Sequence, residues 1–99
     1  MADDVFYNVS FDGMGYYAKQ NNDIVGEITF VYIGVDKLII DYTNVISIYR
    51  KNEIILELVR LVAEHARRNS RKILTLCPIA RSVFNRYPEF DDVRLINAH

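Results

Sequence analysis

Residues 50–57 read RKNEIILE, and within this octapeptide the hydrophobic pattern of the chain changes. Upstream, residues 24–33 and 37–45 are rich in β-branched and aromatic side chains, which is typical of strands. Downstream, the pattern steps by three and four residues, which predicts an amphipathic helix from about residue 52 to the pair Asn69-Ser70. The members of its inward stripe are Ile54, Ile55, Leu58, Leu61, Val62, His65 and Ala66. The octapeptide is therefore a strand-to-helix junction.

A short apolar run at residues 71–76 follows the predicted helix and is typical of a buried strand. Because the helix lies between this run and residues 37–45, the two strands are expected to be parallel, as in a βαβ unit. Pro78 suits the first position of a second helix that extends to about Arg86. Residues 93–96 are expected to add a last edge strand.

The part of the chain before residue 37 predicts antiparallel strands. Residues 5–10 and 16–19 are separated by a turn cluster that contains Gly13 and Gly15, which indicates a first hairpin. Antiparallel hairpins that lead into a βαβ unit indicate an α+β sheet with helices packed on it. At 99 residues, the whole chain 1–99 is expected to be one domain.

The composition excludes several classes of partner. With a net charge of −1 and a pI near 6.1, the chain has no overall attraction to nucleic acid or to an anionic membrane. The basic cluster at residues 67–72 is explained by the negative end of the helix dipole. We therefore expect no nucleic-acid partner and no membrane partner.

Cys77 is the single cysteine, so the chain cannot form an internal disulfide, and without CxxC or CxxH spacing the sequence has no metal signature. The acidic start lacks the basic and apolar regions of a signal peptide. These features favour the reducing cytoplasm as the location.

Four pieces of the sequence resemble one known family in order and spacing. They are residues 26–30 (GEITF), 39–45 (IIDYTNV), 72–80 (KILTLCPIA) and 87–93 (YPEFDDV). Together they resemble the small single-domain branch of the GNAT superfamily of acyl-CoA-dependent N-acetyltransferases. The resemblance implies a mostly antiparallel sheet with a splayed parallel strand pair and two main helices. It also implies that an amine, on a small molecule or a protein, attacks the thioester of acetyl-CoA directly.

The same resemblance implies where acetyl-CoA binds. Its pantetheine arm would enter between the strand that ends near Val45 and the strand at residues 71–76, and its pyrophosphate would lie near Arg50, Lys51 and Asn52. A helix start suits an anion, because its first N–H groups are unsatisfied and the helix dipole is positive there.

The phosphate loop departs from the family pattern at two positions. That pattern has a basic residue, two free residues, glycine, one free residue, and glycine or alanine. Arg50 matches it, but Glu53 adds a carboxylate and Ile55 adds bulk where small residues let phosphate approach the backbone. The same residues also make a good helix start without a ligand, with Asn52 as N-cap and Ile55 on the core face.

Cys77 is the first candidate for chemistry. It precedes Pro78 and so lies at or next to a helix N-cap, where the dipole favours thiolate. By resemblance, it also lies near the acyl thioester. The alternative is a small buried hydrophobic residue that closes the strand.

Two carboxylates are candidates for the base that accepts the proton of the amine. A tight turn at residues 34–36 would place Glu27 opposite Thr43, and Thr29 opposite Asp41, on one face of a two-stranded ladder. The other face would then be apolar and would contain Ile28, Phe30, Leu38, Ile40 and Tyr42. The alternative is an ordinary outward polar face.

Tyr42 stands where the family frequently has histidine. A tyrosine can donate a hydrogen bond to a leaving thiolate but cannot act as a base near neutral pH without a large change in pKa. Packing of the ring is the simpler expectation. A rival to the enzyme as a whole is a protein that keeps the fold, has lost usual CoA binding, and binds a partner or forms a homodimer.

Overall fold

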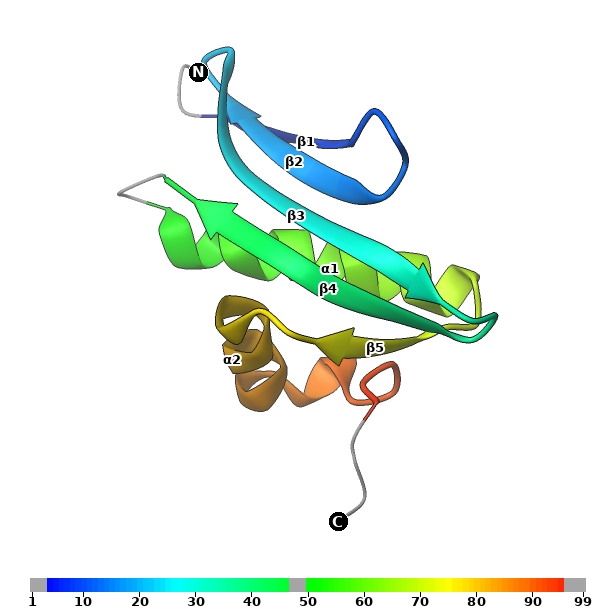
Figure 1. Cartoon of the computed structure of the whole chain (residues 1–99). Coiled ribbons are helices and arrows are strands. Elements are labelled where there is room, and N and C mark those ends of the chain that lie inside the picture. The colour runs from blue at the N-terminus through cyan, green and yellow to red at the C-terminus, as the bar shows by residue number, and fades with distance from the viewer. Residues whose placement is uncertain (1–3, 47–49, 96–99) are drawn as a thin grey trace.

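The computed structural model describes residues 4–46 and 50–95 and contains one five-stranded sheet, in the order β1-β2-β3-β4-β5 (Figure 1). The first four strands are antiparallel neighbours: β1 (Val5–Val9), β2 (Gly15–Gln20), β3 (Asp23–Ile33) and β4 (Lys37–Val45). The last strand, β5 (Lys72–Thr75), is parallel to β4. The predicted α+β class and the predicted parallel pair are confirmed.

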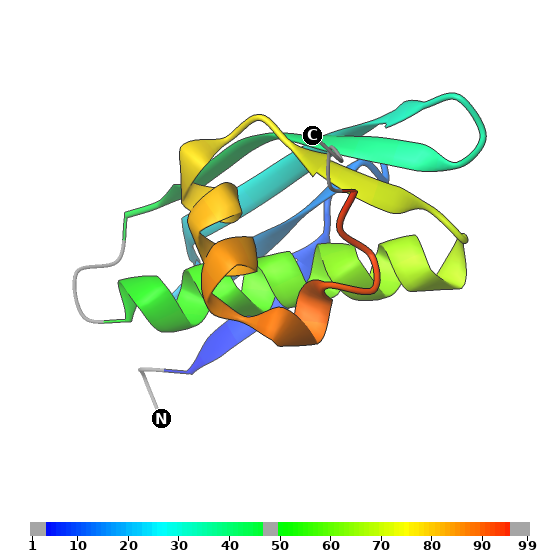
Figure 2. The same ribbon diagram turned by 90° about the horizontal axis from the view of Figure 1, so that it is seen from below.

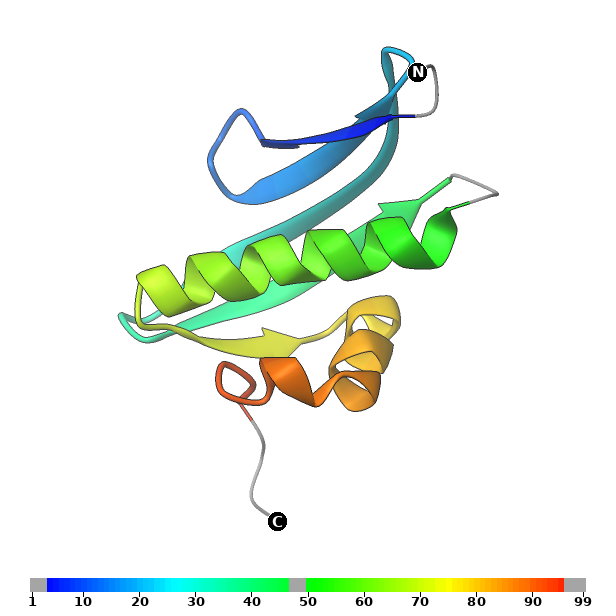
Figure 3. The ribbon, with the colours of Figure 1, turned by 180° about the vertical axis from the view of Figure 1, so that it is seen from behind.

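The helices lie on one face of the sheet. Helix α1 (Lys51–Arg68) crosses this face, and α2 (Pro78–Arg86) lies beside its first half, followed by the short 3₁₀ helix η1 (Pro88–Phe90) (Figures 2 and 3). Among the described elements, none covers the other face (Figure 1). Within residues 4–46 and 50–95, no helix is both long and apolar enough to cross a membrane.

The core lies between α1 and the sheet, as the helical stripe predicts. The fully buried side chains include Ile28, Phe30, Leu38, Ile40, Ile54, Leu58, Val59 and Val62. Gly26 permits this close packing, because a Cβ atom there would lie 3.0 Å from Ile54 Cγ2 and 3.1 Å from Val45 Cγ2. The first half of α1 is therefore held firmly against β3 and β4.

Two predicted boundaries are wrong. Asn52 is not the N-cap of α1, since Arg50 occupies that position without a side-chain capping bond and the Ile54 N–H donates to the Arg50 carbonyl at 2.9 Å. The predicted last strand at residues 93–96 reduces to one parallel bridge between Ile73 and Arg94, and Ile96 lies outside the described residues. The chain from η1 to Arg94 turns too tightly to continue a ladder.

Candidate functional site

The two parallel strands separate halfway along β4. Their pairing extends from Lys37 opposite Lys72 to Ile40 opposite Thr75, and the Leu76 N–H donates to the Ile40 carbonyl at 3.1 Å. Beyond Ile40, β4 continues without a paired strand on this side among the described residues, and the chain after β5 turns into α2. The splay implied by the family resemblance is therefore present.

A β-bulge marks the point of separation. Thr29 pairs with Tyr42 and Phe30 pairs with Ile40, so Asp41 is the extra residue of β4. Bulges bend a strand and end regular pairing, and they often occur beside functional sites. Asp41 Oδ1 accepts a hydrogen bond of 2.7 Å from Thr29 Oγ1, which ties the bulge to β3.

The bulge also corrects the predicted register. The turn pairs Ile33 with Lys37 as expected, but beyond the bulge Glu27 faces Asn44 and not Thr43. A shift of one residue exchanges the two faces of a strand. Tyr42 is therefore 46% exposed, which overturns its predicted place in the apolar face, while Thr43 is buried.

The two candidate bases lie on the face of the sheet away from α1. Glu27 and Asp41 are both exposed. Asp41 lies where β4 and β5 separate, next to the exposed ring of Tyr42, whereas Glu27 lies further along β3 opposite Asn44. The structure thus places Asp41 and Tyr42 at the splay, and Glu27 lies further from it along the sheet.

Cys77 lies across the splay, at the N-cap of α2, and Pro78 occupies the first helical position. The thiol is partly buried, and this burial raises its pKa. Hydrogen bonds from the Ala80 and Ile79 N–H groups and from the hydroxyl and N–H of Thr43 outweigh burial, so the pKa of Cys77 is lowered overall. The predicted position at a helix N-cap is confirmed, and the surroundings favour thiolate.

Thr43 is a residue that sequence reasoning placed on the wrong face. Its hydroxyl oxygen is buried and has no nitrogen or oxygen partner among the described residues, and its polar neighbour is the Cys77 sulfur, a weak hydrogen-bond acceptor. Buried polar atoms are nearly always paired in proteins. A buried hydroxyl whose partner is a weak one is therefore a feature that a polar group bound at the splay would explain.

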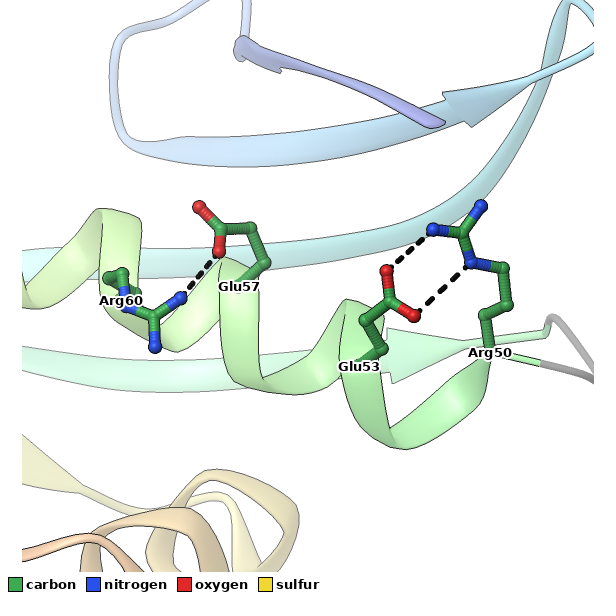
Figure 4. Close-up of polar contacts among 4 residues, drawn as sticks. All are labelled: Arg50, Glu53, Glu57 and Arg60. Atoms are coloured by element: carbon green, nitrogen blue, oxygen red, sulfur yellow. Dashed lines mark hydrogen bonds and ion pairs between the residues drawn. The ribbon is translucent and has the colours of Figure 1, made fainter. Parts of the chain in front are cut away.

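Arg50 and Glu53 bind one another at the start of α1. Arg50 Nη2 donates to Glu53 Oε2 at 2.6 Å, and Arg50 Nε donates to Glu53 Oε1 at 3.3 Å. The hydrogen bond from Arg50 lowers the pKa of Glu53. Figure 4 shows this pair on the flank of α1 that faces β2. The charge of Arg50 is thus matched by Glu53.

A crevice of about 320 Å³ opens on the other flank, between the first turns of α1 and one side of α2 along its whole length. Ile55, Leu56, Ile79 and Val83 are among its apolar walls, and its polar lining includes Asn52 and Arg86. Its size and lining resemble those of small-molecule sites. Ile55 is 7% exposed and forms part of the wall while it also packs in the core.

The remaining predicted cofactor residues lie at the edges of this site. Lys51 is exposed at the first helical position of α1. Val45 is 5% exposed, and its side chain packs in the core near Gly26, so its main chain is the part available to a ligand. Among the described residues, no group of three or more histidine, cysteine or acidic side chains is arranged to hold a metal ion.

Comparison with known proteins agrees with this arrangement. Residues 15–93 match the family model described as GCN5-related N-acetyl-transferase. The fold matches the NMR structure of a GCN5-like N-acetyltransferase candidate from Staphylococcus aureus, with a TM-score of 0.70 and 29% identity over 86% of this chain and 84% of that chain. No curated protein matches the chain. With its splayed β4 and β5 and its matched residues 15–93, the chain belongs to the GCN5-related N-acetyltransferase family.

Proposed function

We propose that the protein transfers an acetyl group from acetyl-CoA to an amine. The family supports the class of reaction. The observation that carries the proposal is the pairing, at the splay, of the buried Thr43 hydroxyl with the Cys77 thiol, whose pKa is lowered. An inactive protein that only kept the fold would be free to fill this place with an apolar side chain, which would remove the cost of burying a polar group with only a weak partner.

The residues at the splay and in the crevice fit the two chemical parts of the donor. The apolar walls formed by Ile55, Ile79 and Val83 suit the pantetheine chain, and the main chain beyond Asp41 offers hydrogen-bonding groups that β5 does not use. The unsatisfied N–H groups in the first turn of α1 suit phosphate. Acetyl-CoA would supply the activated acetyl thioester.

In the proposed reaction, the amine nitrogen forms a bond to the acetyl carbon, and the bond from that carbon to the CoA sulfur breaks. Asp41 is our first candidate for the base that takes the amine proton, because it lies at the point of separation, and Glu27 is the second. The exposed Tyr42 hydroxyl is suited to donate a hydrogen bond to the leaving thiolate. Its exposure favours this role over packing.

Cys77 offers a second route by which the acetyl group could reach the amine. Its thiolate would attack the acetyl carbon, release CoA as the thiol after protonation, and hold the acetyl group as a thioester until the amine arrives. The observation that favours this route is the set of N–H groups from α2 and β4 around the thiol. Intact-mass measurement after incubation with acetyl-CoA alone tests it, since a Cys77-dependent gain of one acetyl group is expected.

Isothermal titration of the purified protein with acetyl-CoA and CoA tests the proposed function. Binding is expected, together with a rise in melting temperature, because a ligand that binds only the native state stabilises it. No heat at near-millimolar ligand and an unchanged melting temperature would leave the inactive binding module as the better reading.

Release of free CoA in the presence of a panel of amines then tests the base. Asp41→Asn should lower kcat/KM by about 10²-fold or more, with little change in the Kd for CoA. Glu64→Gln removes a carboxylate from the exposed face of α1 and serves as the control. Equal activity of Asp41→Asn and the control would exclude Asp41 and direct the same test to Glu27.

A further inference from the structure

Arg50, the basic residue that matches the family's phosphate loop, is badly placed to hold a phosphate in the crevice. Both its Nε and Nη2 groups are directed to Glu53, at 3.3 Å and 2.6 Å. The pair lies on the flank of α1 that faces β2, and α2 lies on the other flank (Figure 4). To reach a ligand between the two helices, Arg50 would have to leave Glu53 and expose that carboxylate near the phosphate.

Arg86 is a cation that already lines the crevice. It is exposed in the last turn of α2. It lies on the same helical face as Ile79 and Val83, which form part of the apolar wall. None of the ion pairs or side-chain hydrogen bonds found within residues 4–46 and 50–95 involves its guanidinium. Its donors are therefore available to an anion.

Asn52 completes the arrangement from the α1 side. It lines the same crevice and belongs to the first helical turn, where no side chain caps the N–H groups. Guanidinium groups bind phosphate through two parallel hydrogen bonds, and apolar walls strengthen such contacts by reducing the local dielectric.

From this geometry we infer that Arg86 of α2, and not Arg50, is the side chain that binds a phosphate group of the donor, with Asn52 and the first turn of α1 opposite it. The inference rests on the proposed use of acetyl-CoA. Arg50 then has a different task, which is to neutralise Glu53 so that this carboxylate does not repel the ligand. The positive charge that the family places at the helix start is supplied here by the neighbouring helix.

Isothermal titration with CoA, dephospho-CoA and pantetheine tests the inference on four proteins: wild type, Arg86→Gln, Arg50→Gln and Arg68→Gln. Arg68 is exposed near the end of α1, so its change is a matched loss of one positive charge outside the site. Arg86→Gln should weaken CoA binding at least tenfold and leave pantetheine binding within twofold. Arg50→Gln should have a smaller effect, and Arg68→Gln none.

Dephospho-CoA identifies which phosphate Arg86 binds. A tenfold loss with CoA but not with dephospho-CoA assigns Arg86 to the 3′-phosphate, and a loss with both assigns it to the pyrophosphate. The inference is overturned if Arg86→Gln binds CoA as wild type does, if Arg50→Gln shows the larger loss, or if pantetheine binding falls equally. If the wild-type protein binds neither CoA nor pantetheine, the proposed function is overturned as well. If it binds both and Arg86→Gln behaves as wild type, only the inference about Arg86 fails.

Discussion

The two ends of helix α1 differ in how their backbone groups are satisfied. At its C-terminal end, the Arg71 N–H donates to the Ala66 carbonyl at 2.8 Å and the Ser70 N–H donates to the Arg67 carbonyl at 3.3 Å, which is the Schellman pattern. Asn69 Nδ2 adds a bond of 2.8 Å to the His65 carbonyl. The N-terminal end has no side-chain cap. Binding is proposed at the end where the helix leaves its own groups unsatisfied.

Side-chain contacts follow the same division. At the C-terminal end, Arg71 stacks at 3.7 Å over the ring of Tyr32 and donates to the carbonyls of Gly34 and Lys37, and His65 Nε2 shares a 2.7 Å hydrogen bond with the Tyr32 hydroxyl. These contacts tie α1 to the β3–β4 turn. The Arg50–Glu53 pair, by contrast, connects the N-terminal end of the helix to itself. The C-terminal end of α1 anchors the fold, and the N-terminal end can admit a ligand.

Truncation of the apolar residues in the first turn of α1 should have the largest effect, and Ile55→Ala is the informative change because this residue belongs to the core and to the crevice at once. We expect the free energy of unfolding to fall by about 2–3 kcal/mol, the lower part of the range for such truncations. The reason is that the part of the Ile55 side chain that faces the crevice makes fewer packing contacts than a fully buried side chain. Ile54→Ala, at a fully buried position, is the matched control and should cost about 3–4 kcal/mol. Urea denaturation measures both.

CoA affinity separates the two variants further, since Ile55 lines the crevice and Ile54 does not belong to its lining. Only Ile55→Ala should change the Kd. A cost below about 1 kcal/mol for Ile55→Ala would mean that the open end of α1 is loose throughout and not only on its crevice flank.

Arg71→Ala should weaken the anchored end by about 2 kcal/mol, because it removes two charged hydrogen bonds to carbonyl groups and the contact with Tyr32. The free energy of unfolding from urea denaturation is the measurement. Arg68→Ala, an exposed change of the same kind nearby, should cost almost nothing. If Arg71→Ala also weakened CoA binding, the two ends of α1 would not be independent.

The features of this fold that depend on residues close together in the sequence could be predicted, and those that depend on contacts between distant segments could not. The helix α1 follows from the local spacing of apolar residues. The parallel pairing of β4 and β5 follows from the helical crossover that joins these two strands. The bulge at Asp41 left no such signal, because neither glycine nor proline marks it and Asp-Tyr-Thr fits a regular strand equally well. The faces of Tyr42 and Thr43 were therefore exchanged.

The start of α1 and the crevice show two further limits. Asn52 is a far better N-cap residue than arginine, yet the helix begins one residue before it, at Lys51. Arg86 belongs to the site because of how α2 lies against α1, and that placement is set by long-range packing. The residues of α2 at positions 79, 82, 83 and 86 do share one helical face, which was the one available signal.

Ser70→Gly should stabilise the anchored end by about 1 kcal/mol. Ser70 has a φ of 55° at the position after the helix where glycine is usual, and a side chain disfavours this left-handed conformation. Thermal unfolding should show a higher melting temperature. Asn69→Gly is the control, because it removes the side-chain bond to the His65 carbonyl at a φ of −106° and should lower the melting temperature. A fall in both variants would show that the cap is not under backbone strain.

The smallest expected effects are the coupling free energies of the ion pairs at the two ends of α1. Arg67 Nε and Nη2 donate to the two oxygens of Asp92 at 2.8 Å and 2.9 Å, and this pair joins α1 to the segment after η1. Both side chains are more than a third exposed, so solvent screens the attraction. A double-mutant cycle with Arg67→Gln and Asp92→Asn should give a coupling free energy of about 0.5 kcal/mol.

The Arg50–Glu53 cycle should give a smaller coupling, because residues three positions apart stay close in the unfolded chain and retain part of their attraction there. The pH dependence provides an independent check. The hydrogen bond from Arg67 lowers the pKa of Asp92, so the contribution of this pair is complete above the unfolded pKa of about 3.9 and is lost as the pH falls through the lower folded pKa. Asp92→Asn should remove that part of the acid sensitivity. Equal couplings in the two cycles would mean that the long-range pair does not hold the C-terminal end of α1 more firmly than a pair within the helix, and that its anchoring rests on Arg71 and the backbone cap.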